Sequence, residues 1–328
     1  MGQDRSKRAR IPIALAAAVV ALFGTAAHAN CPQNRLNGLT ATLSGSPVVG
    51  SYDPFAGADA VVDMSVALTN PANQVCDAAI SFARAPTAAV MSNGAATLSY
   101  ALEPAGGGGS LITTGYVQSS TPGAANRVNV TVPAEGSASA AFRLRIPASQ
   151  VVAAGSYQDI QIQLILVGIG NNGPESSRSG PSFVPQATVI QKCILPSPSL
   201  PSVNLSSAIA NGRPNEGVSQ SVSFSNVQCT APTKLRLTGA ALQPTISTPA
   251  RPGFDNFINF RAAGTFGAAS SVLTTATTAN SVDSVQKNAA SGATTNGQIA
   301  VDINLVNGQP IIAGAYSGTL TVSIDPSF

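Results

Sequence analysis

The chain is poor in the residue types on which most enzymes depend. Its only histidine is His28, near the N-terminus, it has no tryptophan, and 9% of its residues are charged. Histidine-based nucleophiles and zinc sites need an imidazole, and the sequence offers none beyond that position. The 14 acidic residues are scattered without a pairing pattern. The composition therefore predicts a protein that is not an enzyme and that uses no metal or cofactor.

The first 29 residues have the pattern of an export signal. Basic residues precede an apolar run from Ile11 to Phe23, and Ala27-His28-Ala29 follows it. The run is 13 residues long, whereas a transmembrane helix needs about 20. We expect cleavage after Ala29, export through the periplasm and an extracellular location. A retained membrane anchor is the alternative.

The net charge of the chain belongs to this first segment. Four of the 17 basic residues and one of the 14 acidic residues lie in it, so the remainder is formally neutral. Nucleic acids and acidic membranes are bound by basic surfaces. We therefore predict no nucleic-acid partner. The lack of tryptophan also disfavours a lectin that stacks sugar rings on aromatic side chains.

The four cysteines fall into two pairs along the chain. Cys31 and Cys76 enclose one stretch, and Cys193 and Cys229 enclose another of similar length. An exported protein meets an oxidising compartment, so two disulfides are expected. Three connectivities are possible, and the internal repeat described next favours pairing within each stretch. The sequence has no C-x-x-C spacing, which disfavours a metal site.

The two cysteine pairs are each followed by strand-like runs and then by a similar closing phrase. RIPASQVVAAGSYQDIQIQLIL begins at Arg145, and LVNGQPIIAGAYSGTLTVSI begins at Leu305. The runs alternate apolar with small polar residues, Asn-Gly turns separate them, and no helical period appears. We predict an all-β fold of two immunoglobulin-like β-sandwich domains, residues 30–191 and 192–328.

The two copies end differently. Copy one continues through GNNGPESSRSG into PSFVPQATVIQ, and copy two has no equivalent strand after TVSI. If both form one kind of sandwich, the C-terminal domain lacks its last strand. Its closing strand alternates strictly, and we predict that its apolar face, Tyr316, Leu320, Val322 and Ile324, lines a groove that accepts a strand from another chain. The alternative is that residues 325–328 are an ordinary frayed terminus.

Several phrases of copy one resemble the spore coat protein U domain of pilins from archaic chaperone/usher (Csu-type) pili. They are GSYDPFAG from Gly50, LSYAL from Leu98 and RIPASQVVAAGSYQD from Arg145. Copy two keeps the cysteines and AGAYSGTLTVSI but lacks a YDPF phrase, so its assignment depends on the repeat. In that family the last strand of a pilin domain is supplied by the N-terminal extension of the next subunit, which is recognition by strand addition.

The resemblance implies a two-domain tip adhesin that polymerises by donor-strand complementation. Only Asn30 precedes Cys31 in the expected mature chain, so it has no strand to donate, and SFVPQATVIQ would complete the first domain. The implied partners are an adjacent pilin subunit, a periplasmic chaperone, an outer-membrane usher and an abiotic or host surface. The implied role is attachment and biofilm formation. The alternative is a secreted structural coat or matrix protein, or a minor pilin without an adhesive role.

Two loops contain apolar residues that the resemblance suggests for surface contact. Such residues are unusual in glycine-rich loops unless they pack or bind. The candidates are Val90 and Met91 in APTAAVMSNG, and Leu111, Ile112, Tyr116 and Val117 in GGGGSLITTGYVQSSTPG. For the first pair, the alternative that they begin a strand and belong to the core is equally open. Asp53 and Pro54 are predicted to shape a turn rather than bind a ligand.

Overall fold

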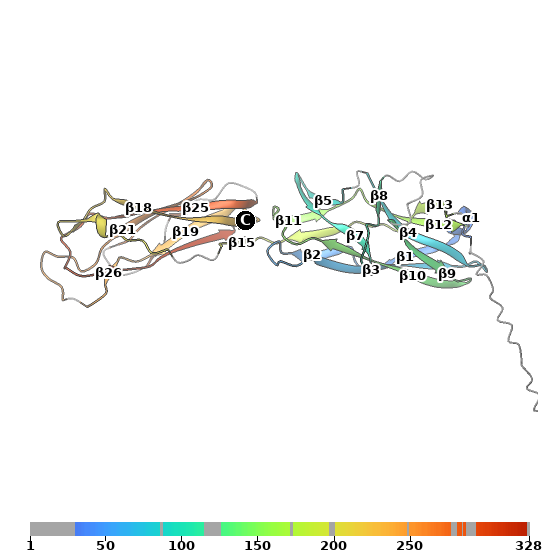
Figure 1. Ribbon diagram of the computed structural model, residues 1–328, viewed down its shortest axis with the longest axis horizontal. Coiled ribbons are helices and arrows are strands. Elements are labelled where there is room, and N and C mark those ends of the chain that lie inside the picture. The colour runs from blue at the N-terminus through green and yellow to red at the C-terminus, as the bar shows by residue number, and fades with distance from the viewer. Residues whose placement is uncertain are drawn as a thin grey trace, which may run out of the picture.

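The computed structural model describes residues 30–85, 88–114, 126–170, 173–196, 201–247, 249–276, 281–283, 285–286 and 293–326. The expected export signal, Tyr116 and Val117 lie outside these residues. The described chain forms two groups of β-strands arranged end to end (Figure 1). We call residues 30–189 the first half and residues 193–326 the second half. No helix among the described residues is long and apolar enough to span a bilayer.

In its described residues the first half contains one short helix and fourteen strands. The helix follows Pro32 and buries Leu36, and six residues are too few to produce the helical period that sequence inspection relies on. The elements are α1 (Gln33–Gly38), β1 (Thr40–Ser44), β2 (Val48–Tyr52), β3 (Ala60–Asn70), β4 (Cys76–Arg84), β5 (Val90–Asn93), β6 (Ala96–Ser99), β7 (Ala101–Pro104), β8 (Ile112–Thr114), β9 (Val128–Val132), β10 (Gly136–Ile146), β11 (Gly155–Gln158), β12 (Gln163–Gly170), β13 (Gly173–Ser179) and β14 (Gln186–Val189).

Among the described residues these strands pair into three sheets around a main hydrophobic core, and Ala79, Ala83, Ile165 and Val167 form a separate small cluster. The orders are β1-β3-β10-β7, β2-β14-β11-β5-β6 and β13-β12-β4-β8, with β9 also paired to β4. Alternate residues of β3 and β10 are buried, as expected for strands with one solvated face. At the centre of the core, the rings of Phe82, Phe142 and Phe183 pack together, with centroids 4.8–6.0 Å apart.

The segment SFVPQATVIQ is part of this first core. Its strand β14 lies between β11, to which it is antiparallel, and β2, to which it is parallel. Phe183, Ala187 and Val189 are all buried there. The strand therefore lies beside β11 in the first core, whereas the strand that flanks β12 on its outer side is β13, from the GNNGPESSRSG segment.

The described part of the second half contains a 3₁₀ turn and thirteen strands. They are β15 (Cys193–Ile194), η2 (Ser206–Ala208), β16 (Ile209–Ala210), β17 (Arg213–Pro214), β18 (Ser219–Cys229), β19 (Thr233–Gly239), β20 (Gln243–Pro244), β21 (Phe260–Phe266), β22 (Ala269–Thr274), β23 (Val282–Asp283), β24 (Val285–Gln286), β25 (Thr294–Leu305), β26 (Tyr316–Ser317) and β27 (Leu320–Pro326). Asn211 and Gly212, both at positive φ, form the tight turn between β16 and β17.

Two sheets of the second half face each other across a second core. One has the order β15-β18-β25-β21-β22-β24 and the other β23-β19-β27, while β20 pairs with β26. Leu235 and Leu237 of β19 pack in one cluster with Ile299 and Val301 of β25. Both halves are thus β-sandwiches, and the prediction of an all-β fold is confirmed.

The same backbone corner recurs in the two halves. Tyr157 donates a hydrogen bond to the carbonyl oxygen of Ala153, and Tyr316 donates one to that of Ile312, in each case four residues earlier. A glycine at positive φ lies two residues before each tyrosine. This resembles the tyrosine corner at the start of a late strand in immunoglobulin-type sandwiches. The repeat seen in the sequence therefore has a structural counterpart.

The disulfides join Cys31 to Cys76 and Cys193 to Cys229, the pairing that the repeat favoured. They close stretches of 45 and 36 residues. In the chain-entropy account each such closure stabilises the fold by roughly 4 kcal/mol, chiefly by restricting the unfolded chain. Each half thus carries one covalent cross-link near its first strand.

The two halves are joined by three residues between β14 and β15. The buried hydroxyl of Thr230 accepts a hydrogen bond from the Lys192 N–H and donates to the Ile190 carbonyl, and the Ala154 N–H donates to the Thr230 carbonyl. Lys192 also forms an ion pair with Asp53, with an N–O distance of 2.6 Å. Burial acts to raise the pKa of Asp53, but the hydrogen bonds from Lys192 and the Phe55 N–H outweigh it, so the pKa lies below its usual value.

Candidate strand-binding edge

The strand β27 has one open side. Among the described residues it pairs with β19 on one side, where Leu235 lies opposite Ile324 and Leu237 opposite Val322, and with no strand on the other. Because directly opposed residues share a face of the sheet, Ile324 and Val322 point into the same core as the two leucines. The leucines are fully buried, whereas the β27 residues are half-buried. The core is therefore less covered at β27 than one strand further in.

The four residues predicted for this strand all take part. Tyr316, Leu320, Val322 and Ile324 are half-buried and pack against the second core. The opposite face of the neighbouring strand β19 is polar, and there Arg236 and Thr238 donate hydrogen bonds to Asp283. The hydrogen bond from Arg236 holds the pKa of Asp283 below its usual value. The sheet is therefore amphipathic, which fixes the face that an added strand would present to the core.

The facing sheet supplies residues that sequence reasoning did not single out. On β18, Val222 and Phe224 are half-buried and contact the same core. Beyond the two-residue strand β15, the side of β18 opposite β25 has no partner among the described residues. In the sequence, Val222 and Phe224 belong to the alternating run QSVSFSNV. It predicts a strand, but it does not tell which strand will lie at an edge.

The open sides of β18 and β27 border the same opening. The short strand β15 pairs with the C-terminal end of β18 and also contacts β27. It therefore connects the two sheets at one end. Beyond it, Val203 and Leu205 of the following segment pack against the core, but among the described residues no further strand pairs with this side of β18 or with β27. We call this feature the open edge and define it by Val222, Phe224, Leu320, Val322 and Ile324.

The open edge runs toward a small cavity at β26. The cavity has a volume of about 180 Å³ and is lined by Pro244, Thr245, Ile246, Ala313, Gly314, Ala315 and Tyr316. Burial raises the pKa of Tyr316, so its hydroxyl stays protonated and donates to Ile312. Ile246 on the rim is 77% exposed, and Phe254 further along that loop is 48% exposed. The end of the second half near β26 is thus unusually apolar for a surface.

The structure corrects the prediction of apolar surface-binding loops. Met91 is fully buried opposite Leu98 in the β5–β6 hairpin, so the alternative that it belongs to the core is right, and Val90 is half-buried. Leu111 and Ile112 are also in the core. Glycines at positions 107–109, all at positive φ, let the chain turn back, so that β8 pairs in parallel with β4. Tyr116 and Val117 lie outside the described residues, and their role stays a prediction.

Asp53 behaves as the sequence suggested. One carboxylate oxygen accepts the Phe55 N–H in a local turn, and the other binds Lys192. No cluster of three or more potential metal-binding side chains is found in the described part of the chain.

Comparison with known proteins gives resemblance in three dimensions only. The sequence matches no family model and no curated protein at a significant level, so the likeness to spore coat protein U domains stays a prediction. The chain is similar to the CsuC–CsuE chaperone–tip adhesion subunit complex of archaic chaperone-usher Csu pili from Acinetobacter baumannii. The identity is 12%, the match covers 87% of this chain and 100% of that one, and the TM-score is 0.40.

Two further solved structures are similar at a lower level. The CupB6 tip adhesin from Pseudomonas aeruginosa shares 12% identity over 88% of this chain and 95% of its own, with a TM-score of 0.28. CfaE, the adhesive subunit of CFA/I fimbria of enterotoxigenic Escherichia coli, shares 11% over 87% and 93%, with a TM-score of 0.32. Because all three TM-scores are low, these likenesses carry no argument about what this chain does.

Proposed function

We propose that the chain is a pilus subunit whose second half is completed by a β-strand from another polypeptide. In this proposal residues 30–191 form a self-complete adhesive domain and residues 192–328 form a strand-accepting pilin domain. The chain sits at the tip of a chaperone/usher pilus, where it mediates attachment and biofilm formation. A periplasmic chaperone occupies the open edge during export, an outer-membrane usher assembles the subunits, and an adjacent pilin subunit donates the final strand.

The observation that carries the proposal is the open edge itself. In the first half, the strand after the corner tyrosine is flanked on both sides, by β4 and β13. In the second half, the strand after the equivalent tyrosine is flanked on one side only, in the described residues. An alternating strand added there would find main-chain groups to pair with and apolar residues to cover.

The energetic reward for adding a strand is substantial. Covering half-exposed side chains such as Leu320, Val322 and Ile324 contributes about 1 kcal/mol each, half of the value for full burial. Each main-chain hydrogen bond formed along β27 adds about 1 kcal/mol net. The side chains of the incoming strand contribute as well. These terms oppose an ordering cost of about 1–2 kcal/mol per residue of the peptide. The proposal requires that they exceed it, so an isolated strand should bind measurably.

Hydrogen exchange with a synthetic strand tests this directly. The probe is a peptide of about 12 residues in which valine or isoleucine alternates with threonine or serine, long enough to pair along a strand of ordinary length. The peptide should slow exchange of the β27 amides and of β18 residues 219–224. The amides of β12, which is already flanked on both sides, should be unaffected.

A matched control peptide separates strand addition from nonspecific adhesion. It has the same sequence but carries N-methyl groups on the amides that would face β27, so it cannot pair. Protection by the first peptide and not by the second supports the proposal. Equal protection by both, or protection of β12 as strongly as β27, would show that the open edge does not accept a strand.

The pilus part of the proposal has a separate test. A gene for a periplasmic chaperone and one for an outer-membrane usher should lie beside the gene for this chain. Deleting the chain in the producing cell should then lower attachment to plastic or host cells while shaft subunits are still exported. Normal attachment after deletion would leave strand acceptance intact but would reject the adhesive role.

A further inference from the structure

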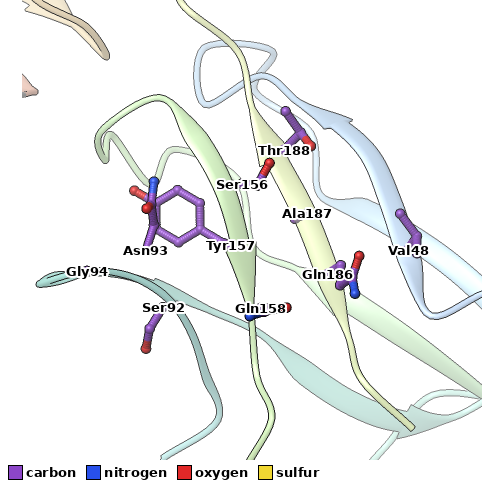
Figure 2. Close-up of a pocket in the computed structure, with 10 residues that line it drawn as sticks. All are labelled: Val48, Ser92, Asn93, Gly94, Ser156, Tyr157, Gln158, Gln186, Ala187 and Thr188. Atoms are coloured by element: carbon purple, nitrogen blue, oxygen red, sulfur yellow. The ribbon is translucent and has the colours of Figure 1, made fainter.

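The first half contains a cavity that the strand-accepting function does not use. It has a volume of about 360 Å³, within the range of roughly 300–1,000 Å³ typical of small-molecule sites. It is lined by Val48, Ser92, Asn93, Gly94, Ser156, Tyr157, Gln158, Gln186, Ala187 and Thr188. Figure 2 shows that these residues come from four neighbouring strands, with Asn93 on one side and Val48 on the other.

The cavity exists because two strands separate. β11 pairs with β5 at one position only, Gln158 with Ser92, so the strands diverge toward Asn93 and Ser156. Asn93 then lies over Gly155, where a Cβ atom would come within 2.5 Å of its amide nitrogen. Gly155 is also at a φ of +138°, which other residues rarely adopt. The glycine of the tyrosine corner thus makes room for one wall of the cavity.

The chemistry of the lining is uniform. Six of the lining side chains are exposed, polar and uncharged: Ser92, Asn93, Ser156, Gln158, Gln186 and Thr188. Among the described residues, none of these six side chains makes an intramolecular hydrogen bond. The only ionisable residue in the lining is the buried Tyr157. Tyr157 uses its hydroxyl in the corner and offers none to the cavity. Three amides and three hydroxyls are therefore free to donate and accept.

The outer face of another sheet in the same half looks quite different. On β10, Arg145 pairs with Asp59 and Glu103, and Arg143 lies 3.6 Å from Asp63. These groups are charged and lie beside groups of opposite charge, although Arg143 Nε has no hydrogen-bond partner. The lining of the cavity is uncharged, so it differs from this part of β10.

We propose that this cavity binds a neutral carbohydrate unit, a mono- or disaccharide. Amide and hydroxyl side chains both donate and accept hydrogen bonds, which matches the hydroxyl groups of a sugar. An extended peptide would need a continuous strand edge, but β14 is paired along its length on both sides and β11 leaves only Gly155 to Tyr157 unpaired on the β5 side, so most of the cavity floor offers side chains instead of free backbone. Without an aromatic platform the site relies on hydrogen bonds alone, which predicts weak binding.

Saturation-transfer NMR on the purified chain provides the test. The probes are the methyl glycosides of glucose, galactose, mannose and N-acetylglucosamine, together with maltose and lactose. At least one should bind with a Kd of roughly millimolar strength, which corresponds to a few net hydrogen bonds. Because no charged side chain lines the cavity, the Kd should change less than about twofold between low and high salt.

Variants locate the binding. Gln186→Ala and Asn93→Ala should each weaken it by about fivefold or more, the loss expected for one or two hydrogen bonds. Thermal unfolding should be unchanged, since both side chains are exposed and unpaired. Gln74→Ala removes another exposed glutamine, outside the cavity, and serves as the control.

Three results would overturn the proposal. The first is that no sugar of the panel gives a binding signal. The second is an equal loss of binding in the Gln74→Ala control. The third is that an uncharged tripeptide amide binds while no sugar does. None of them bears on the open edge, which lies in the other half of the chain, so the strand-accepting function stands or falls separately.

Discussion

The two halves differ in how completely the strand after the corner tyrosine is buried. In the first, strands flank β12, the strand that follows the corner tyrosine, on both sides. Its Leu164 and Leu166 are fully buried in the main core, and Ile165 and Val167 are buried in a smaller cluster on the opposite face. In the second, Leu320, Val322 and Ile324 remain half-buried at an edge. The comparison teaches that the repeated sequence sets the fold of each half. The strand that follows the repeat, β13 in the first half, decides whether the closing strand is flanked on both sides.

The halves also differ two residues after the corner tyrosine, where each closing strand is interrupted. The first half has Asp159, which accepts hydrogen bonds from Arg84 at 2.6 Å and from Tyr100 at 2.8 Å. Burial and the hydrogen bond to Asp159 raise the pKa of Tyr100. The second half has Gly318, where a Cβ atom would lie 2.9 Å from Leu242. A buried polar network in one half is thus replaced by close backbone packing in the other.

The largest effect should come from breaking that network. Asp159→Ala leaves Arg84 as a buried charge without its carboxylate and should lower the free energy of unfolding of the first half by about 3–5 kcal/mol. The control is Glu103→Ala, which removes a partly exposed partner of Arg145 and should cost about 1 kcal/mol or less. Chemical denaturation with exchange read separately for each half would measure both. Similar losses for the two variants would contradict the buried role of Asp159.

Two leucine-to-alanine substitutions, one in each half, measure how completely each core is covered. Leu166→Ala removes a fully buried side chain and should cost about 2–5 kcal/mol, because it leaves a cavity. Leu320→Ala makes the same chemical change at the open edge and should cost about 1 kcal/mol. Adding the alternating peptide should increase the second cost and leave the first alone. Equal costs without the peptide would mean that the second core is already closed.

The smallest effect concerns the two corner hydroxyls. Tyr157→Phe should destabilise the first half by about 1 kcal/mol, the net value of one hydrogen bond in a buried setting. Tyr316→Phe should cost less, since Tyr316 is half-buried and water can satisfy the Ile312 carbonyl. Half-specific hydrogen exchange can resolve the difference. A larger loss for Tyr316 would indicate that the second corner is better covered than the geometry implies.

Much of the fold could be predicted from local sequence. The alternation of β27, the Asn211-Gly212 turn and the spacing of the cysteines each report on one segment or one pair, and each is found as expected. The half-buried state of Leu320 and Val322 also agrees with an edge position. These features depend on short-range geometry or on the repeat, which a single sequence contains.

The failures concern long-range pairing. Leu111 and Ile112 look like exposed loop residues, because nothing near them in sequence reveals that three glycines return the chain to β4. The sugar-sized cavity was equally hidden, since its lining comes from β2, β5, β11 and β14 and each strand contributes only ordinary polar residues. Asp159 was passed over for the same reason, as its partner Arg84 lies 75 positions away.

The short connection between the halves has a mechanical consequence. Tension applied to the second half reaches the first through Ile190, which directly follows β14. The Thr230 hydroxyl holds the chain there by a hydrogen bond to the Ile190 carbonyl. The pull therefore acts along the axis of a strand that is hydrogen-bonded on both sides, to β2 and to β11. Bonds loaded in shear must yield together, whereas bonds that are unzipped yield one by one. We therefore expect the junction at β14 to resist a pull along that strand better than an unzipping pull.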